Sequence, residues 1–199
     1  MVANSQALWN QFRAGNSEAF GKIAQLHYRP LFNYGLRLTS DPDLVHDCIQ
    51  QLYLELWEKK DSVSETEFVK TYLLRALRNK VVKELIRLKK LRQAGELAFE
   101  TISEPSIEFT LIQNEHQLQQ VQQLNQVINQ LSKRQQEILY LRFYQNLEYE
   151  DISQIMGITK QSAANLLHRT IKDMKRSWNF LSFFFLNIFH WRFKMIILN

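Results

Sequence analysis

The chain of 199 residues is long enough for one or two small domains, and its hydrophobic fraction of 45% excludes an intrinsically disordered protein. Five glycines and three prolines are too few for a turn-rich β protein, so the composition favours helices. A formal charge of +5 indicates an anionic partner, and the single cysteine, Cys48, excludes an internal disulfide and fits a reducing cytoplasm.

Two helices are predicted before residue 61. The polar pair at residues 16–17 can cap the first, which Pro30 is expected to kink or interrupt because proline has no N–H to donate. Asp41 as N-cap and Pro42 in the first turn are typical of a second helix start, and the apolar spacing continues to about Lys60.

One face of this second helix has the composition of a protein interface. It mixes a carboxylate and amides with a leucine and aromatic rings, which is typical of surfaces that bind other proteins. An ordinary solvated face is the alternative that spacing alone leaves open. The residues of this face are Asp47, Gln50, Gln51, Tyr53, Leu54 and Trp57.

A long basic helix is predicted over residues 65–92, opened by a capping box of Ser64 with Glu67. Phe68 is expected on its apolar side. Residues 68–92 carry nine basic side chains against Glu84 alone, a net charge of +8. Surface helices usually mix signs, so this excess predicts contact with a nucleic-acid backbone, and an aromatic near the helix start suits base stacking. The basic residues are Lys70, Arg75, Arg78, Lys80, Lys83, Arg87, Lys89, Lys90 and Arg92.

Helical periodicity fails over residues 93–114, where four glutamates and a proline occur without Lys or Arg. This segment is predicted to be a flexible acidic linker between two helical domains, residues 1–92 and 115–177. A Gln-rich amphipathic helix is expected at 115–131. A further helix to about residue 144 would begin with a capping box of Ser132 and Gln135.

Residues 147–176 have the pattern of a helix-turn-helix. A short apolar-striped helix precedes Gly157, where a helix end often needs positive φ, and Thr159 can cap the next helix. Ala163 and Leu167 mark the packed face of that second helix. The alternative is a helical hairpin that only packs, but the excess of positive charge favours DNA. The side chains offered to a groove are Thr159, Lys160, Gln161, Ser162, Asn165, His168, Arg169 and Lys172.

The tail, residues 178–199, is aromatic and apolar but is interrupted by polar and basic side chains. Its most apolar run, residues 180–189, is about half a bilayer span. Three interpretations remain open for it. The tail could pack on the second domain, dock weakly on a partner or a membrane surface, or stay disordered.

The motifs in this order resemble the extracytoplasmic-function (ECF) sigma factors, small two-domain specificity subunits of bacterial RNA polymerase. TSDPDLVHDCIQQLYLELW resembles the family's polymerase-binding helix, D-P-x-x-A-E-D-x-x-Q-x-x-F-x-x-x-W, and YLLRALRN resembles W-L-x-x-I-A-R-N. LSKRQQEILYLRFYQNLEYEDISQIMGIT is similar to L-P-x-R-x-R-x-x-x-x-L-R followed by L-S-Y-x-E-I-A-x-x-L-G-I-S. The resemblance covers residues 17–176.

The resemblance implies an all-α fold of two small helical domains on a flexible linker, the second containing the helix-turn-helix. The first domain would bind the β′ clamp helices of core RNA polymerase, and the second would contact the β flap and the minus-thirty-five promoter element in the major groove. The long basic helix, with the loop at residues 61–67, would bind the minus-ten element and trap unstacked bases. The implied minus-ten residues are Tyr72, Arg75, Arg78, Asn79 and Lys83.

The resemblance further implies control by an anti-sigma factor, and it implies no cofactor, metal or catalytic residue. Two other classes of protein are weaker alternatives. An ordinary helix-turn-helix regulator leaves the basic helix and the mixed face unexplained, and a membrane-surface adaptor would depend on the tail. An enzyme is disfavoured, because no nucleophile–base set, paired carboxylates, metal-ligand spacing or phosphate-binding glycine loop occurs.

Overall fold

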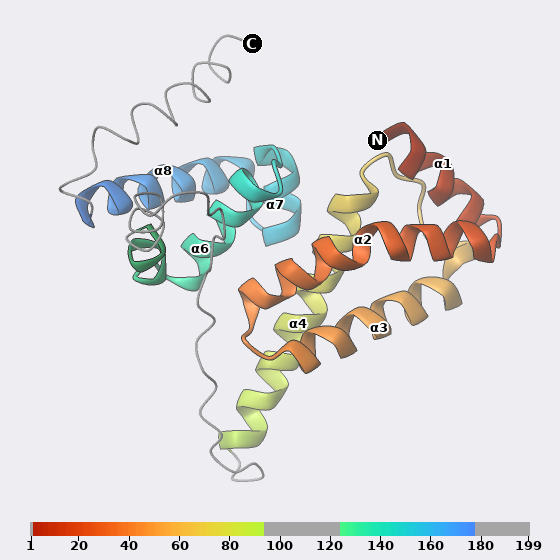
Figure 1. The fold of residues 1–199 in the computed structure, drawn as a ribbon, viewed down its shortest axis with the longest axis horizontal. Helices are drawn as coiled ribbons and strands as arrows, with labels where there is room; N and C mark the ends of the chain where they lie inside the picture. The colour runs from red at the N-terminus through yellow and green to blue at the C-terminus, as the bar shows by residue number, and fades with distance from the viewer. Residues whose placement is uncertain (1, 94–123, 178–199) are drawn as a thin grey trace, which may run out of the picture.

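The computed structural model describes residues 2–93 and 124–177, and within these ranges every regular element is a helix (Figure 1). The predicted all-α fold is therefore confirmed. The tail and nearly all of the predicted linker lie outside the described residues. The described elements are α1 (Val2–Arg13), α2 (Ser17–Leu38), α3 (Pro42–Glu58), the 3₁₀ helix η1 (Lys60–Ser62), α4 (Val69–Gln93), a helical segment at 124–129, α6 (Lys133–Leu139), the π-helix η2 (Tyr140–Tyr144), α7 (Tyr149–Met156) and α8 (Lys160–Ser177).

Local capping places most helix starts where the sequence predicts them. The Asn16 side chain accepts a hydrogen bond from the Ala19 amide, and Asp41 caps α3 in the same way. Ser132 and Gln135 form the full capping box of α6. The predicted interruption at Pro30 does not occur, because α2 continues through it. A proline removes one backbone donor, and the remaining bonds of a long helix can hold it together.

The start of α4 differs from the prediction. The helix begins at Val69 rather than at residue 65, so the expected capping box of Ser64 does not open it. The backbone carbonyls of Val63 and Ser64 instead accept hydrogen bonds from α1 side chains. Phe68 is 60% exposed, not packed on the apolar side of the helix. Tertiary contacts with α1 thus keep residues 63–68 out of the helix.

Helices α1 to α4, residues 2–93, form a first module. In Figure 1, α2 and α3 lie side by side and α4 crosses both of them. Gly35 makes the close approach of α2 and α3 feasible, because a Cβ there would overlap the Val45 side chain. The largest fully buried side chains of the first module are Trp9, Phe12, Ile23, Leu31, Tyr34, Ile49, Leu73, Leu74 and Leu77.

The second module, residues 124–177, packs α6, η2, α7 and α8 around Ile138, Leu141 and Ile152. The single helix expected to residue 144 is divided, since α6 gives way to a π-helical turn in which the Gln145 amide donates to the Tyr140 carbonyl. A π-turn inserts one extra residue per turn and so re-aims the chain. It directs the backbone toward the helix-turn-helix.

The two modules touch each other. α4 packs along α7, and α2 packs against α6, so one continuous set of buried apolar residues spans both modules. No helix in the two described ranges is long and apolar enough to cross a bilayer.

Candidate polymerase and nucleic-acid interfaces

The mixed face predicted on α3, hereafter the α3 face, points away from the core. The buried stripe of α3 leaves Asp47, Gln50, Gln51 and Leu54 exposed, while the rings beside them are partly buried. Leu54 is 64% exposed, an unusual position for a large apolar side chain. The six predicted residues thus share one side of one helix, as their spacing indicated.

A shallow groove of about 510 Å³ lies on the α3 face, and α2 supplies one of its walls. Phe20 of α2 packs on Trp57 with 5.3 Å between ring centroids and edge-to-face on Tyr53 at 6.0 Å. Ser17 also lines the groove, beside Leu54 and Gln50. Sequence analysis missed both α2 residues, because the contact joins separate helices. The result is an apolar aromatic floor with an amide at its rim.

The amide of Gln50 is held in place by a small polar network. His46 Nε2 lies 2.6 Å from Gln50 Nε2, and the other ring nitrogen of His46 lies 3.0 Å from the Tyr28 hydroxyl. Gln51 donates to Glu55 at 3.2 Å. These contacts limit the rotamers that the exposed amides can adopt, which lowers the entropic cost of binding a partner.

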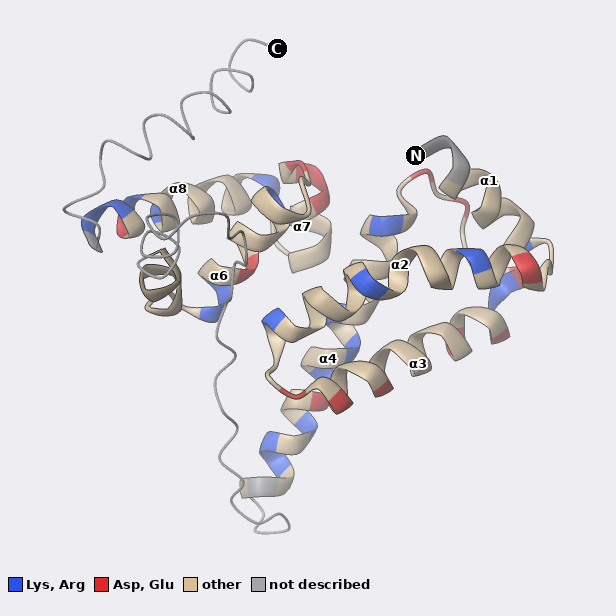
Figure 2. Ribbon diagram, viewed as in Figure 1, with Lys and Arg blue, Asp and Glu red and all other residues tan. Residues whose placement is uncertain are grey.

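The basic face of α4 is less positive than its sequence suggests. Arg75, Asn79 and Lys83 are exposed, as a DNA-binding face requires. Lys80, however, is paired with Glu55 of α3, and Arg87 pairs with a glutamate on its own helix. Figure 2 shows Lys and Arg along α4 and α8, with Asp and Glu along α3 and at the start of α7.

Arg78, a predicted minus-ten residue, is bonded to the second module through a buried cluster of Tyr34, Arg78 and Glu137, hereafter the Glu137 cluster. Glu137 of α6 is only 4% exposed. Its Oε1 accepts from Arg78 Nε at 2.7 Å and from the Tyr34 hydroxyl at 2.6 Å, and its Oε2 lies 3.4 Å from Arg78 Nη2. Three helices that are far apart in sequence therefore meet at one carboxylate.

In the Glu137 cluster, the pKa shifts of Tyr34 and Arg78 keep the tyrosine protonated and the arginine charged. Burial, reinforced by the carboxylate of Glu137, raises the pKa of the Tyr34 hydroxyl well above its ordinary value. Burial, the largest single effect, lowers the pKa of Arg78, but the hydrogen bond and charge of Glu137 together with Tyr34 outweigh it, so that the pKa of Arg78 is raised overall. The tyrosine stays a neutral donor and the arginine stays a cation. Sequence analysis assigned no functional role to Glu137 or Tyr34.

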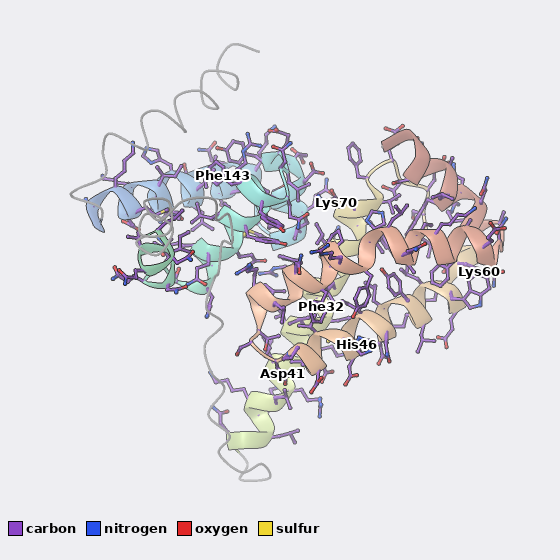
Figure 3. The ribbon with its side chains drawn as sticks, in the orientation of Figure 1. Phe32, Asp41, His46, Lys60, Lys70 and Phe143 are labelled. Carbon is purple, nitrogen blue, oxygen red and sulfur yellow. The ribbon has the colours of Figure 1, made fainter. Side chains whose placement is uncertain are left out.

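Two further bonds join α4 to the second module. The Thr71 hydroxyl donates to Asp151 at 2.9 Å, and Lys70 Nζ donates to the Gln145 carbonyl at 3.1 Å. Lys70, labelled in Figure 3, lies where α4 faces the second module. Burial lowers the pKa of Lys70. The helix-turn-helix thus covers part of the helix that carries the minus-ten candidates.

His27 makes this region sensitive to acid. Its Nε2 is buried, and burial first, then the charge of Lys70, lowers the pKa of the imidazole. A lowered folded-state pKa contributes stability that is present above the unfolded value of about 6.5 and is lost as pH falls through the folded value. The wild type is therefore expected to lose thermal stability from pH 7 to about pH 5 more steeply than His27→Gln. Calorimetric melting at several pH values measures this, and parallel curves would contradict it.

The helix-turn-helix forms as predicted. α7 ends at Gly157, which adopts φ +63°, and the Thr159 hydroxyl oxygen accepts from the Ser162 amide at 3.1 Å. Ala163 and Leu167 are buried against the module. All eight predicted groove-facing side chains, from Thr159 to Lys172, are exposed. The geometry brings them together on one side of α8.

The hydrogen bonds among the α8 side chains do not prevent these side chains from reaching a DNA groove. Gln161 donates to Asn165 at 3.1 Å, and Arg169 Nε donates to the Asn165 carbonyl at 3.3 Å. Lys160 lies 3.7 Å from Glu150, but both are exposed, and such pairs contribute little. DNA phosphates could therefore displace these contacts at small cost.

Two family models match the chain, one over each of the two modules that carry these surfaces. Sigma-70 region 2 matches residues 23–91, which hold the α3 face and most of α4. Sigma-70 region 4 matches residues 121–174, which hold the helix-turn-helix. Together the two regions cover more than half of the chain, in the order that the resemblance predicts.

Whole-chain relatives agree. The chain is 25% identical over 163 residues to the ECF RNA polymerase sigma factor SigM of Bacillus subtilis, covering 79% of this chain and 94% of SigM. It is 24% identical over 148 residues to the RNA polymerase sigma factor SigV of the same organism, covering 74% of this chain and 81% of SigV.

Solved structures share the fold. The sigma factor RpoE, solved in complex with the anti-sigma factor NepR from Bartonella quintana, superposes with a TM-score of 0.60 at 20% identity, covering 81% of this chain and 97% of RpoE. CnrH in complex with the cytosolic domain of CnrY gives a TM-score of 0.61 at 15% identity, covering 88% of this chain and 97% of CnrH. The protein therefore belongs to the sigma-70 family, in its ECF class, and is an RNA polymerase sigma factor that directs transcription initiation.

Proposed function

We propose that the chain works through three surfaces. The α3 face binds the β′ clamp helices of core polymerase, α4 with the loop before it binds and melts the minus-ten element, and α8 reads the minus-thirty-five element. The observation that carries this proposal is the exposed aromatic groove of the α3 face, in the same module as the exposed Arg75, Asn79 and Lys83 of α4. A regulator that binds only duplex DNA has no use for such a groove. Polymerase, in the cytoplasm, performs the chemistry.

The described arrangement fits a resting state, since it cannot span a promoter. The two elements lie ~25 base pairs apart, or ~85 Å at ~3.4 Å per pair. The modules instead touch through the Glu137 cluster, which covers Arg78. The chain between Gln93 and Leu124 could extend to ~100 Å. Promoter binding would therefore separate the modules and release Arg78 toward DNA.

An anti-sigma factor is the partner we propose for this resting state. Of the structural neighbours above, RpoE was solved in complex with an anti-sigma factor, and CnrH was solved in complex with the cytosolic domain of CnrY. A partner that binds the closed arrangement better than the open one would shift the population toward it. A membrane-surface contact of residues 178–199 stays a prediction.

In vitro transcription tests the proposal as a whole. The purified chain is added to sigma-free core polymerase on a library of genomic fragments, and the transcript starts are mapped. We expect starts that share two short upstream motifs and that require the added chain. Transcripts that need only the core enzyme, or duplex binding that needs no core enzyme, would support an ordinary regulator instead.

Arg169→Ala tests the role of α8. The exposed guanidinium is expected to contact phosphate, so its loss should weaken binding to every promoter alike. It should also make the slope of log affinity against log salt concentration shallower by about one. Fluorescence anisotropy of holoenzyme on promoter duplexes at several salt concentrations measures both effects. The exposed Lys22 on α2 gives the control, Lys22→Ala, which should leave the slope unchanged. A loss confined to one base pair would show that Arg169 reads a base.

A further inference from the structure

The loop before α4, residues 63–68 (the α4 loop), is bonded to α1 along its first half. The buried indole of Trp9 donates Nε1–H to the Ser64 carbonyl at 3.1 Å, and Arg13 Nε donates to the Val63 carbonyl at 2.7 Å. Side chains thus satisfy backbone carbonyls that a helix or a sheet would otherwise satisfy. Figure 1 shows this loop running past α1. Its path is therefore set by a helix that lies 50 residues or more earlier in the chain.

α1 also contacts the groups that this loop presents. Asn10 Nδ2 donates to the carboxylate of Glu65 at 3.0 Å. The Trp9 ring packs edge-to-face on Tyr72, with 5.2 Å between centroids. Phe68, at the far end of the loop, exposes 60% of its surface to solvent. One helix thus braces both the loop and a neighbouring candidate minus-ten residue.

α1 lies before residue 23, where the match to Sigma-70 region 2 begins, so that match assigns it no role. We propose that α1 is a positioning element for promoter melting. In this role Trp9 and Arg13 hold the α4 loop in the shape that accepts an unpaired base of single-stranded promoter DNA. The inference rests on the proposed minus-ten function of α4 and its loop.

The physical reason is pre-organisation. A loop without helix or sheet bonds loses backbone entropy when it closes around a ligand, and that loss weakens binding. Stacking and edge contacts also discriminate among bases only when their donors and acceptors hold fixed positions. Bracing by α1 removes the entropic cost before the base arrives. Loss of the brace should therefore reduce both affinity for single strands and base preference.

The test uses a brace-release variant, Trp9→Phe with Arg13→Met, which removes both donors and keeps most of the apolar volume. The matched control is Ile49→Val, which removes one buried methyl group from α3 in the core of the same module and removes none of the bonds between α1 and the loop. Holoenzyme made with each full-length chain is offered single-stranded DNA carrying four randomised bases, and the bound pool is sequenced. Duplex affinity for a mapped minus-thirty-five site is measured in parallel.

We expect the brace-release holoenzyme to lose about tenfold in single-strand affinity and most of its base preference, with duplex affinity within twofold of wild type. The single variant Arg13→Lys, whose ammonium can still donate to the Val63 carbonyl, should keep most of the base preference that the brace-release variant loses. The inference is overturned if the brace-release variant keeps the wild-type preference, or if Ile49→Val loses as much. If wild-type holoenzyme itself shows no preference, the proposed minus-ten function fails.

Discussion

The Glu137→Ala variant is expected to lose about 3 kcal/mol of stability and to separate the two modules. The substitution removes the carboxylate that accepts hydrogen bonds from both the Tyr34 hydroxyl and the Arg78 guanidinium. The hydroxyl is then buried, and the guanidinium half-buried, without this partner. In the closed arrangement the Arg78 charge would remain desolvated without a partner, which costs more than the pair itself contributes and favours separation of the modules. Chemical denaturation measures the loss.

Separation of the modules can be measured directly. Nitroxide labels on cysteines placed at Gln25 of α2 and Gln154 of α7, both exposed, report the distance between modules, and the native Cys48 is buried. Glu137→Ala should broaden this distance distribution and shift it outward. The free variant should also bind non-specific DNA more tightly than wild type, since Arg78 becomes available to phosphate.

Matched variants decide whether the carboxylate itself matters. Tyr34→Phe removes one neutral donor and should cost only about 1 kcal/mol. Arg78→Met combined with Glu137→Ala removes both charges, and it should cost less than Glu137→Ala alone because no unpaired ion remains. Equal costs for the single and double variants would show that Glu137 and Arg78 are not energetically coupled.

Leu54→Asp is expected to weaken binding to core polymerase about 30-fold, or about 2 kcal/mol. Leu54 is 64% exposed beside the aromatic groove, so a carboxylate there costs the folded chain little. On binding, the new charge would be desolvated against apolar rings. Titration of labelled core enzyme without DNA isolates this step from promoter recognition.

Ile86→Asp provides the control for Leu54→Asp. Ile86 lies on α4 and is 52% exposed, so the substitution adds the same charge at a similar exposure away from the α3 face. Its affinity for core polymerase should match wild type. If both variants lose affinity equally, net charge is responsible, and the α3 face has no special role in docking.

The helix-turn-helix was predictable because its signals are local. Gly157 at positive φ and the Thr159 cap act within four residues, and the apolar spacing of α8 repeats with the helical period. The α3 face was predictable for the same reason, since its residues share one helix. The relatives and family matches confirm the sigma-factor assignment, whereas the individual site residues stay predictions.

The start of α4 was not predictable, because local and distant bonds compete for the same backbone. Ser64 has the spacing of a helix cap, but in the fold residues 63–65 accept hydrogen bonds from α1 side chains instead. The charge of α4 was misjudged in a similar way. A count along the sequence includes Lys80 as a free cation, whereas the fold pairs it with Glu55 of α3.

By itself, the sequence determined α2, α3, α7 and α8, most of their caps, the turn at Gly157 and the faces that α3 and α8 expose, because each depends on residues within a few positions of one another. The sequence analysis did not predict α1 (Val2–Arg13). Only the tertiary structure decided which charges are neutralised, where the α4 loop is held and how the modules meet. Glu137 shows the reason. Its partners lie 59 and 103 residues away, and no periodicity encodes a bond that forms only when separate helices pack.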